Sequence, residues 1–483
     1  MKNSKELMPE LVNSKNFVNC RISGLYLDSR DVKEGGLFFA IKGKHLNGID
    51  FIEEARSKGA NLIISEELVK NKNVVHCHNI KQLIGKFASR FYSFPSEQLK
   101  TFCATGTNGK TTSVEAYARI CTNLGEKCGY LSTIGKSLDG KTVNESSTLT
   151  TPDSISLNKS LCEMLSNGAT HAAFEASSHG LDQGRLSEIN IDYAVLTSFS
   201  QDHLDYHKSI ESYGNAKSKL FKQLNPKNSF IQIDSEFGRN LHKELLKEET
   251  EVFSVSLEKE SDYFASFKKN NDSLEVSLKS PYGITEFSLS TISRYIASNV
   301  ICSMAALCVH GIKLDKIAES ASEISFPAGR LESIRIGKDI CYVDYAHTPE
   351  ALKHTLKEIR DFHEGEIWCV FGCGGNRDKE KRPIMGEIAE QYSDHVIITD
   401  DNPRNESSNQ IIDDILEGTT KSKNIKTISN RREAIQFTLD EMAKRKSMNI
   451  LLLAGKGHEN YQIIGSKKNR FDDKETLISL TKY

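Results

Sequence analysis

The stretch KTFCATGTNGKTTSVEAYARICTN, residues 100–123, decides the fold of this chain. It begins with an apolar run at 101–104, turns through glycines, and continues as Lys110-Thr111-Thr112 into a segment with helical spacing of apolar residues. Strand, glycine turn, Lys-Thr and helix form a phosphate-binding loop, because backbone N–H groups and the helix N-terminus converge on an anion. Lys110 is expected to reach the outer phosphates of a nucleotide, and the Thr111 hydroxyl to bind Mg²⁺.

The loop departs from the usual pattern at one position, where Ala104 replaces the first glycine. An ordinary glycine turn between strand and helix is the alternative interpretation. The order of strand, Gly-Lys-Thr and helix favours the phosphate site. The residues expected to surround the phosphates are Gly106, Thr107, Asn108, Gly109, Lys110, Thr111 and Thr112.

Length and composition set the class of protein. A chain of 483 residues exceeds one hydrophobic core, and its net charge of −2 gives no general attraction to nucleic acid or membranes. The N-terminus lacks a signal-peptide core, and no apolar run approaches the roughly 20 residues that span a bilayer. Eleven cysteines without CxxC pairs indicate reduced, mostly buried thiols. We therefore expect a cytoplasmic monomer that acts on small molecules.

The pattern of apolar residues in 1–95 predicts a small α/β unit. Its strands are expected at 37–41 and 61–65, and its helices at 49–58 and 81–92. The boundary falls near the Phe-Pro-Ser sequence that ends this stretch, because proline interrupts regular structure.

Two apolar strands of the middle unit, residues 96–328, end in polar side chains. Strand 171–175 ends at Glu175, and strand 193–199 runs into a polar segment that carries His203. Ligands of α/β sheets gather at strand ends, so both side chains are candidate metal ligands, with structural or solvated roles as the alternative. Lys217, on the following helix, is expected to be solvated on the sequence pattern alone.

The last unit, residues 329–483, alternates strands with helices. Strands are expected at 341–345, 366–371, 395–399 and 449–454, and helices at 349–362, up to 392, and at 410–416. This succession predicts a mostly parallel sheet with right-handed crossovers. Each strand is followed by a polar loop, and turn chemistry alone is the alternative to a charged binding site there. The charged loop residues are Asp344, His347, Arg377, Asp401, Arg404, Lys456 and Glu459.

Eight motifs occur in the order seen in the Mur ligases of peptidoglycan synthesis, which the chain resembles over essentially its whole length. They are ATGTNGKTT, EASSHGLDQGR, QDHLDYH, GRLE, VDYAHTPEAL, FGCGGNRDKEKRP, DDNPRNE and AGKGHENYQ. The chain is most similar to members that add the third amino acid. The resemblance implies a three-domain α/β architecture, with an N-terminal UDP-binding domain (1–95), a central P-loop ATPase domain (96–328) and a C-terminal Rossmann-like amino-acid-binding domain (329–483).

The resemblance implies an ATP-dependent ligase that forms an amide bond. A D-glutamyl side-chain carboxylate attacks the γ-phosphorus of ATP, and an incoming amine displaces phosphate from the acyl phosphate. Activation is needed because a carboxylate is a poor electrophile, and the chemistry is mostly positioning and charge neutralisation. The implied substrates are ATP, UDP-N-acetylmuramoyl-L-alanyl-D-glutamate and meso-diaminopimelate, and the implied cofactor is Mg²⁺.

The resemblance also assigns site residues. Lys110, Lys217, His203 and Arg330 match catalytic positions, and Asn299 matches a residue of the ATP site. The implied metal ligands are Thr111, Glu175, His203 and Lys217, the last as a carbamate. The muramoyl-dipeptide site is expected to comprise Leu27, Ser29, Lys44, His45, Thr150, Thr151, Ser177, Gln183 and Arg185. The chain departs from the family where Ile296 replaces an asparagine that contacts adenine.

The loop Asp401-Asn402-Pro403-Arg404 indicates which amino acid is added. Pro403 stiffens the backbone before Arg404, and a guanidinium offers a planar fork to a carboxylate. L-lysine carries only an ammonium at its far end, whereas meso-diaminopimelate carries a second carboxylate as well. DNPR is also the form seen in family members that add meso-diaminopimelate. The site is expected to comprise Arg377, Asp401, Asn402, Pro403, Arg404, Gly455 and Glu459.

Three alternatives stay open at this point. The first is the same ligase adding L-lysine. The second is another Mur ligase or a folylpolyglutamate synthetase, which shares the phosphate loop but is not expected to carry DNPR with AGKGHE. The third is a non-catalytic regulator that binds ATP without releasing phosphate.

Overall fold

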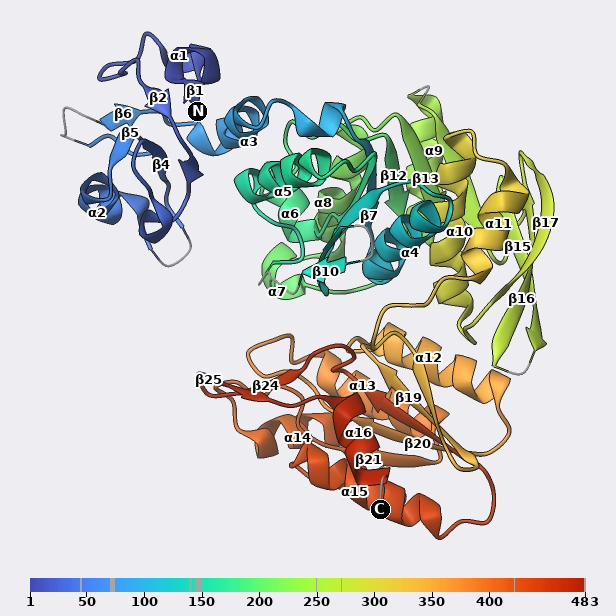
Figure 1. Cartoon of the computed structure of the whole chain (residues 1–483). Helices are drawn as coiled ribbons and strands as arrows, with labels where there is room; N and C mark the ends of the chain where they lie inside the picture. The colour runs from blue at the N-terminus through green and yellow to red at the C-terminus, as the bar shows by residue number, and fades with distance from the viewer. Residues whose placement is uncertain are drawn as a thin grey trace. The chain divides into compact units, whose positions relative to one another are not determined.

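The structure is a computed structural model, shown in Figure 1. It describes residues 1–43, 46–69, 74–138, 141–143, 149–248, 250–270, 272–420 and 422–481. Lys44 and His45, both predicted for the dipeptide site, lie outside the described residues. The chain divides into two compact units, the first comprising 1–105, 125–194 and 216–229, and the second 106–124, 195–215 and 230–483.

The N-terminal part of the first unit is built on a parallel four-stranded sheet. Its strands in order are β3 (Leu25–Tyr26), β4 (Gly36–Ala40), β5 (Ala60–Ser65) and β6 (Val74–His76). All of β4 is buried because alternate residues face opposite sides: Phe39 clusters with apolar residues of α3 (Ile80–Phe91), and Phe38 with those of α2 (Ile52–Ser57).

The helix predicted at 49–58 is wrong over residues 49–51. The chain there forms the 3₁₀ turn η3 (Gly48–Phe51), and the α-helix begins only at Ile52. The Asn47 side chain accepts a hydrogen bond from the N–H of Ile49, at 3.4 Å. This local bond caps the tighter 3₁₀ turn, a competition between asparagine and regular helix that apolar spacing does not reveal.

The remaining strands that lie wholly in the first unit form the order β10 (Lys141–Val143), β9 (Gly135–Leu138), β8 (Cys128–Ser132), β11 (His171–Glu175) and β7 (Lys100–Thr105). β8, β11 and β7 are parallel, whereas β9 and β10 turn back as antiparallel strands. β11 and β7 match the predicted strands. Helix α5 (Ser154–Ser166) begins where Asp153 accepts the N–H groups of Ile155 and Ser156 and so caps the helix.

In the second unit, helix α4 (Lys110–Asn123) follows the phosphate loop. The predicted helix face is confirmed, because Val114, Tyr117, Ala118 and Cys121 are all buried. α4 packs on α10 (Arg294–Val309), where the Ser303 hydroxyl donates to the carbonyl of Ser113 at 2.9 Å. The unit also contains α11 (Leu314–Ser322) and α9 (Glu236–Lys247). Its β14 (Val252–Ser256), β15 (Tyr263–Asn270), β16 (Ser273–Ser280) and β17 (Gly283–Leu289) form a run of neighbouring strands.

The C-terminal sheet of the second unit has the strand order β18 (Glu332–Ile336), β19 (Asp339–Asp344), β23 (Asn449–Ala454), β20 (Glu366–Phe371), β21 (His395–Ile398) and β22 (Ile425–Thr427), drawn in orange to red in Figure 1. All its pairings are parallel except that of β18 with β19, which confirms the predicted mostly parallel sheet. The parallel strands therefore direct their carboxyl ends, and the loops that follow, to one edge.

Helices cover both faces of this sheet, and alternate strand residues explain why. Ile367, Cys369 and Phe371 of β20 cluster with α12 (Pro349–Phe362), α13 (Lys381–Tyr392) and α14 (Ser408–Leu416). Trp368 and Val370 cluster instead with α15 (Arg431–Ala443) and α16 (Asp473–Thr481). A central strand buried on both faces accounts for the continuous apolar runs of the sequence.

A fully buried ion pair joins α15 to α16. Arg431 Nε and Nη2 each lie 2.7 Å from the Asp473 carboxylate, and Nη2 also donates to the carbonyl of Ala454 at 2.9 Å. Both side chains have no exposed surface. Removing one partner leaves an unpaired charge in the interior, which typically costs about 3–5 kcal/mol.

We therefore expect Asp473→Ala to lower the free energy of unfolding of this part of the chain by about 3–5 kcal/mol. Trp368, the single tryptophan, lies in β20 and reports urea unfolding of this sheet by fluorescence. The matched control is Glu475→Ala, because its partner Arg470 is 80% exposed and surface pairs contribute about 0–1 kcal/mol. Equal effects of the two substitutions would contradict the expected role of the buried pair.

Candidate active site

The phosphate loop, residues 106–109, leads from the end of β7 into α4. Gly106 and Gly109 adopt φ angles of +153° and +92°. A Cβ on Gly106 would lie 2.0 Å from Thr197 Oγ1, and one on Gly109 would lie 2.4 Å from Asn299 Oδ1. Both positions therefore require glycine, for its backbone conformation and for the close approach of neighbouring atoms.

Residues that follow β12 (Tyr193–Leu196) hold the loop in place. Ser198 Oγ accepts the N–H of Asn108 at 2.9 Å, and the Ser198 carbonyl accepts the N–H of Thr107 at 3.0 Å. The Thr107 hydroxyl donates to the carbonyl of Ser200 at 3.0 Å. The strand predicted at 193–199 therefore ends early, because these residues bond to the loop. Sequence reasoning missed Ser198, although serines beside a strand end were a signal.

Lys110 begins α4, and its side chain lies over the loop. Its ammonium donates to the carbonyls of Gly106 at 2.9 Å and Thr107 at 3.0 Å. The loop and the helix N-terminus thus place a cation and backbone dipoles around the same point, as the motif predicts.

Arg330 lies next to a predicted metal ligand. Its Nη2 donates to Thr111 Oγ1 at 3.3 Å, and its guanidinium carbon lies 4.7 Å from the ring centroid of Tyr345. Beside it, the Asp344 carboxylate accepts the N–H of Leu331 at 2.7 Å. Burial raises the pKa of Asp344, and the Arg330 charge opposes that change. The arrangement places a guanidinium close to the first turn of α4.

A pocket of about 850 Å³ of space not filled by atoms, part of it open to solvent, adjoins the phosphate loop. Asn299, which is predicted for the ATP site, lines this pocket, and so does Ile296, which supplies an apolar wall. Other lining residues, from the phosphate loop, α10, α12 and the segment before β18, include Gly109, Ser293, Tyr295, Arg330, Ala351, His354 and Glu358.

The polar groups of this pocket were not predicted. The Tyr295 hydroxyl lies 2.7 Å from His354 Nδ1. Glu358 accepts the N–H of Arg294 at 2.7 Å, and burial raises the pKa of Glu358 to about 7. These groups come from helices separated by a strand pair in sequence, so spacing alone could not bring them together.

The four predicted metal ligands are divided between the two units, and their mutual arrangement stays a prediction. Thr111 and His203 belong to the second unit, whereas Glu175 and Lys217 belong to the first. Glu175 is buried and accepts the N–H of Thr133 at 2.8 Å. Within the described residues, no group of three or more His, Cys, Asp or Glu side chains could hold a metal. Hydroxyl and carboxylate oxygens nevertheless suit a hard cation such as Mg²⁺.

Lys217 corrects the expectation of a solvated lysine. Its helix, α8 (Ile210–Lys222), turns this side chain inward, so that only 1% of the residue is exposed. The Lys217 side chain is thus enclosed rather than solvated. Carbamylation would make it an oxygen ligand.

The residues predicted for the dipeptide include a connected group in the first unit. Thr151 Oγ1 donates to the carbonyl of Glu175 at 2.8 Å and lies 3.0 Å from Ser177 Oγ. Arg185 donates to the carbonyl of Thr151 at 2.7 Å and to Gln183 Oε1 at 2.6 Å. Of the remaining predicted residues, Thr150 adjoins this group, whereas Leu27 and Ser29 follow β3 of the N-terminal sheet.

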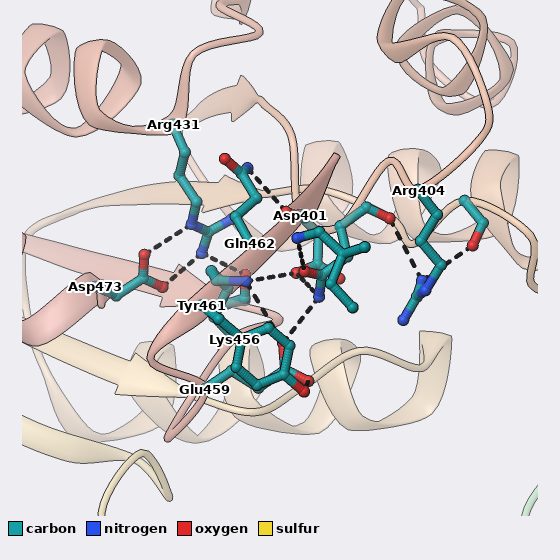
Figure 2. Close-up of polar contacts among 12 residues, drawn as sticks. Asp401, Arg404, Arg431, Lys456, Glu459, Tyr461, Gln462 and Asp473 are labelled. Carbon is teal, nitrogen blue, oxygen red and sulfur yellow. Dashed lines mark hydrogen bonds and ion pairs between the residues drawn. The ribbon is translucent and has the colours of Figure 1, made fainter. Parts of the chain in front are cut away.

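Three of the residues predicted for the amino acid, Asp401, Arg404 and Glu459, lie in one region at the edge of the C-terminal sheet (Figure 2). Asn402 Nδ2 donates to Glu459 Oε2 at 2.8 Å and lies 3.2 Å from Asp401 Oδ1. Lys456 Nζ lies 3.3 Å from Asp401 Oδ1 and 3.4 Å from Glu459 Oε2. Lys456 has no exposed surface. The sequence placed it on this edge but did not assign it to the site.

Arg404 follows β21 with a left-handed φ of +53°. Its Nη1 donates to the carbonyl of Gly375 at 3.0 Å, and its N–H donates to the carbonyl of Ile463 at 2.9 Å. Ile463 belongs to β24 (Tyr461–Ile464), which pairs with β25 (Lys467–Arg470). Burial and the neighbouring Arg377 lower the pKa of Arg404, as expected where two cations converge. Such a site suits an anion.

Comparisons with known proteins agree with this architecture. Three family profiles match separate stretches: "Mur ligase family, catalytic domain" at residues 21–92, "Mur ligase middle domain" at 104–307, and "Mur ligase, glutamate ligase domain" at 329–457. The protein is an ATP-dependent ligase that forms amide bonds. The chain belongs to the Mur ligase family.

Curated relatives align over nearly the whole chain. The UDP-N-acetylmuramoyl-L-alanyl-D-glutamate--2,6-diaminopimelate ligase of Pseudomonas putida is 37% identical over 471 residues, covering 94% of this chain and 93% of that protein. The ligase of the same name from Aquifex aeolicus is 38% identical over 466 residues, covering 95% and 94%. A solved structure with this ligase name is 32% identical, with a TM-score of 0.70 and coverage of 95% and 94%.

A folylpolyglutamate synthase structure from Mycobacterium tuberculosis shares the fold alone. It is 16% identical, with a TM-score of 0.65, and covers 77% of this chain. As for membranes, the helices in the described part of the chain are all too short or too polar to cross a bilayer.

Proposed function

We propose that this protein joins meso-diaminopimelate to UDP-N-acetylmuramoyl-L-alanyl-D-glutamate, with cleavage of ATP to ADP and phosphate, in peptidoglycan precursor synthesis. The observation that carries the proposal is that Arg404 lies at the same sheet edge as the acidic residues Asp401 and Glu459, which Asn402 links by hydrogen bonds. A guanidinium and carboxylates complement an amino-acid end that bears both a carboxylate and an ammonium. Relatives named for this reaction, aligned over at least 93% of their length, support the same substrates.

The loop residues carry out the first half of the reaction. Lys110 and the loop N–H groups bind the ATP phosphates, and Arg330 stabilises charge beside them. A side-chain carboxylate oxygen of the D-glutamyl residue bonds to the γ-phosphorus while the bond to ADP breaks. Mg²⁺, held by Thr111, Glu175, His203 and carbamylated Lys217, would neutralise phosphate charge.

The second half joins the amine. Its nitrogen attacks the acyl carbon, phosphate leaves with the former carboxylate oxygen, and the nitrogen loses a proton to solvent. Thr150, Thr151, Ser177, Gln183 and Arg185 orient the dipeptide, while Leu27, Ser29, Lys44 and His45 bind the uridine end. The hydrogen bonds among Thr151, Ser177, Gln183 and Arg185 support this assignment, because they fix these side chains relative to one another.

The proposal also assigns a role to each domain, the residues of the amino-acid site, and the compartment and oligomeric state. Residues 1–95, 96–328 and 329–483 act as UDP-binding, ATP-binding and amino-acid-binding domains. The site for the amino acid comprises Arg377, Asp401, Asn402, Pro403, Arg404, Gly455 and Glu459. The enzyme works in the cytoplasm as a monomer, where ATP and the nucleotide precursor are available.

A preference for meso-diaminopimelate over L-lysine of at least about a hundredfold in kcat/KM is expected, because the half-buried Arg404 guanidinium would lack a carboxylate partner when L-lysine binds. Arg404→Ala should reduce this preference to less than about tenfold. Arg432→Ala, an exposed arginine of the same sheet's helices, is the matched control and should leave the preference unchanged. Equal use of both amino acids by the wild type, or an unchanged ratio in Arg404→Ala, would exclude Arg404 as the selector.

A phosphate-release assay separates the alternative functions. The proposal requires release that depends on ATP, UDP-muramoyl dipeptide and meso-diaminopimelate together. Release with L-lysine instead would identify the alternative amino acid. Release with a folate and glutamate would identify a folylpolyglutamate synthetase, and ATP binding without release under any pair would identify a regulator.

A further inference from the structure

Lys456 is the buried cation between the two acidic residues of the amino-acid site (Figure 2). Its ammonium contacts Asp401 at 3.3 Å and Glu459 at 3.4 Å. The side chain is fully enclosed, and the ammonium also lies 5.9 Å from the ring centroid of Tyr461. An enclosed ammonium whose neighbours are two carboxylates acts on those carboxylates rather than on a bound substrate.

The two oxygens of Glu459 have different surroundings. Oε2 receives Asn402 Nδ2 at 2.8 Å as well as the Lys456 ammonium. Oε1 makes a longer contact of 3.5 Å with the Tyr461 hydroxyl. The shorter contacts therefore fix the carboxylate through Oε2, and Oε1 is the oxygen placed to accept a hydrogen bond from a ligand.

The groups around Glu459 have opposite effects on its pKa. Burial and then Asp401 raise the pKa of Glu459, whereas Lys456 lowers it. Further charged or titratable groups surround the site. Arg404 comes from the loop after β21, and Arg431, which pairs with Asp473, from α15. Tyr345 comes from the loop after β19, and Tyr461 from β24. Arg404 and Arg431 are further cations, and Lys456 is in direct contact with the Glu459 carboxylate.

We propose that Lys456 is a positioning residue for substrate selection: its enclosed ammonium keeps Glu459 ionised and directs Glu459 toward the second ammonium of the incoming diamino acid. This inference rests on the proposed function. Asp401, Glu459 and Lys456 together carry one net negative charge, which complements one ammonium. Without Lys456, repulsion between the two neighbouring carboxylates would raise the pKa of Glu459 further, and the site would lose part of the negative charge that the ammonium requires.

The test compares kcat/KM for meso-diaminopimelate in wild type and Lys456→Met from pH 6 to pH 9. The ratio of the two kcat/KM values at each pH is independent of the ionisation of the substrate, because both proteins receive the same substrate. Loss of the Lys456 cation raises the pH at which Glu459 ionises. The kcat/KM of Lys456→Met should therefore be at least about tenfold below that of the wild type at pH 7, and the difference should shrink as the pH rises. The loss should appear in KM for the amino acid, while KM for ATP stays within about twofold.

A double-mutant cycle separates this role from simple loss of stability. In a Glu459→Gln background, Lys456→Met should change kcat/KM by less than about twofold at every pH, because the titrating group is gone. Lys456→Arg, which keeps the charge, should retain the wild-type pH dependence. Lys444→Met removes an exposed lysine of the same domain and serves as the control. Lys456→Gln is a second neutral variant if Lys456→Met shows no cooperative unfolding by Trp368 fluorescence.

The outcomes distinguish this inference from the function on which it depends. A wild-type protein inactive with meso-diaminopimelate at every pH would overturn the proposed function, and this inference with it. An active wild type whose ratio to Lys456→Met does not change with pH would overturn only the role of Lys456. The same result follows if Lys456→Met is equally damaging in the Glu459→Gln background.

Discussion

Replacing Lys110 with alanine is expected to lower turnover by at least about a thousandfold, because it removes the cation from the phosphates where charge develops during transfer. The ammonium lies over the loop, 2.9 Å from the carbonyl of Gly106. Alanine favours helix at the first position of α4, so the fold should persist. Phosphate release measures the loss of activity, and circular dichroism measures the fold.

Lys100→Ala is the matched control for this prediction. Lys100 lies at the exposed start of β7, the strand that leads into the same loop. It should retain turnover within about twofold, as expected for an exposed side chain remote from the phosphates. Near-normal ligation by folded Lys110→Ala would contradict the phosphate-loop assignment.

Lys217→Ala should be nearly inactive, with a loss of at least about a hundredfold. The ammonium of this buried residue would first lose a proton. The resulting amine would then add to carbon dioxide and lose a second proton, so that a cation becomes an anionic carbamate whose oxygens can bind a metal. A short-chain carboxylic acid could occupy the space left in Lys217→Ala and return part of the lost activity, because it supplies a carboxylate in place of the carbamate. Activity of the variant is therefore measured with and without added acid.

The neighbouring lysine on α8 provides the control. Lys219 lies on the surface and contacts Asp182 at 2.7 Å, so Lys219→Ala should leave turnover within about twofold. A carbamate on Lys217 should also appear as an added mass on its peptide under mild conditions. Full activity of Lys217→Ala, or absence of both the added mass and the rescue, would rule out the carbamate.

The regular βα elements of the C-terminal sheet could be predicted closely from the sequence. Helix 349–362 and strands 366–371 and 449–454 have the predicted bounds. Their apolar runs are continuous because helices cover both faces, and Pro349 marks the helix start. The run from β14 to β17 was not predicted, since short polar-apolar alternation there carries no motif.

Site residues within a local motif could be predicted, whereas those whose role depends on distant contacts could not. Motifs identified Lys110, Arg404 and Glu459 because their chemistry is tied to a local sequence. The role of Lys456 depends on its contact with Asp401, 55 residues away in sequence, which only the sheet register creates. The burial of Lys217 depends on which face of α8 packs inward, and a helix with lysines on several faces leaves that choice open.

The most direct test of whether the reaction passes through an acyl phosphate is to trace the oxygens of the D-glutamyl carboxylate. UDP-muramoyl dipeptide labelled with ¹⁸O in the D-glutamyl side-chain carboxylate is incubated with ATP, meso-diaminopimelate and the protein, and the released phosphate is analysed by mass spectrometry. An acyl-phosphate ligase must transfer one labelled oxygen to each phosphate and leave the other in the new amide. Phosphate that carries no label, or phosphate released without formation of the tripeptide product, would contradict the account.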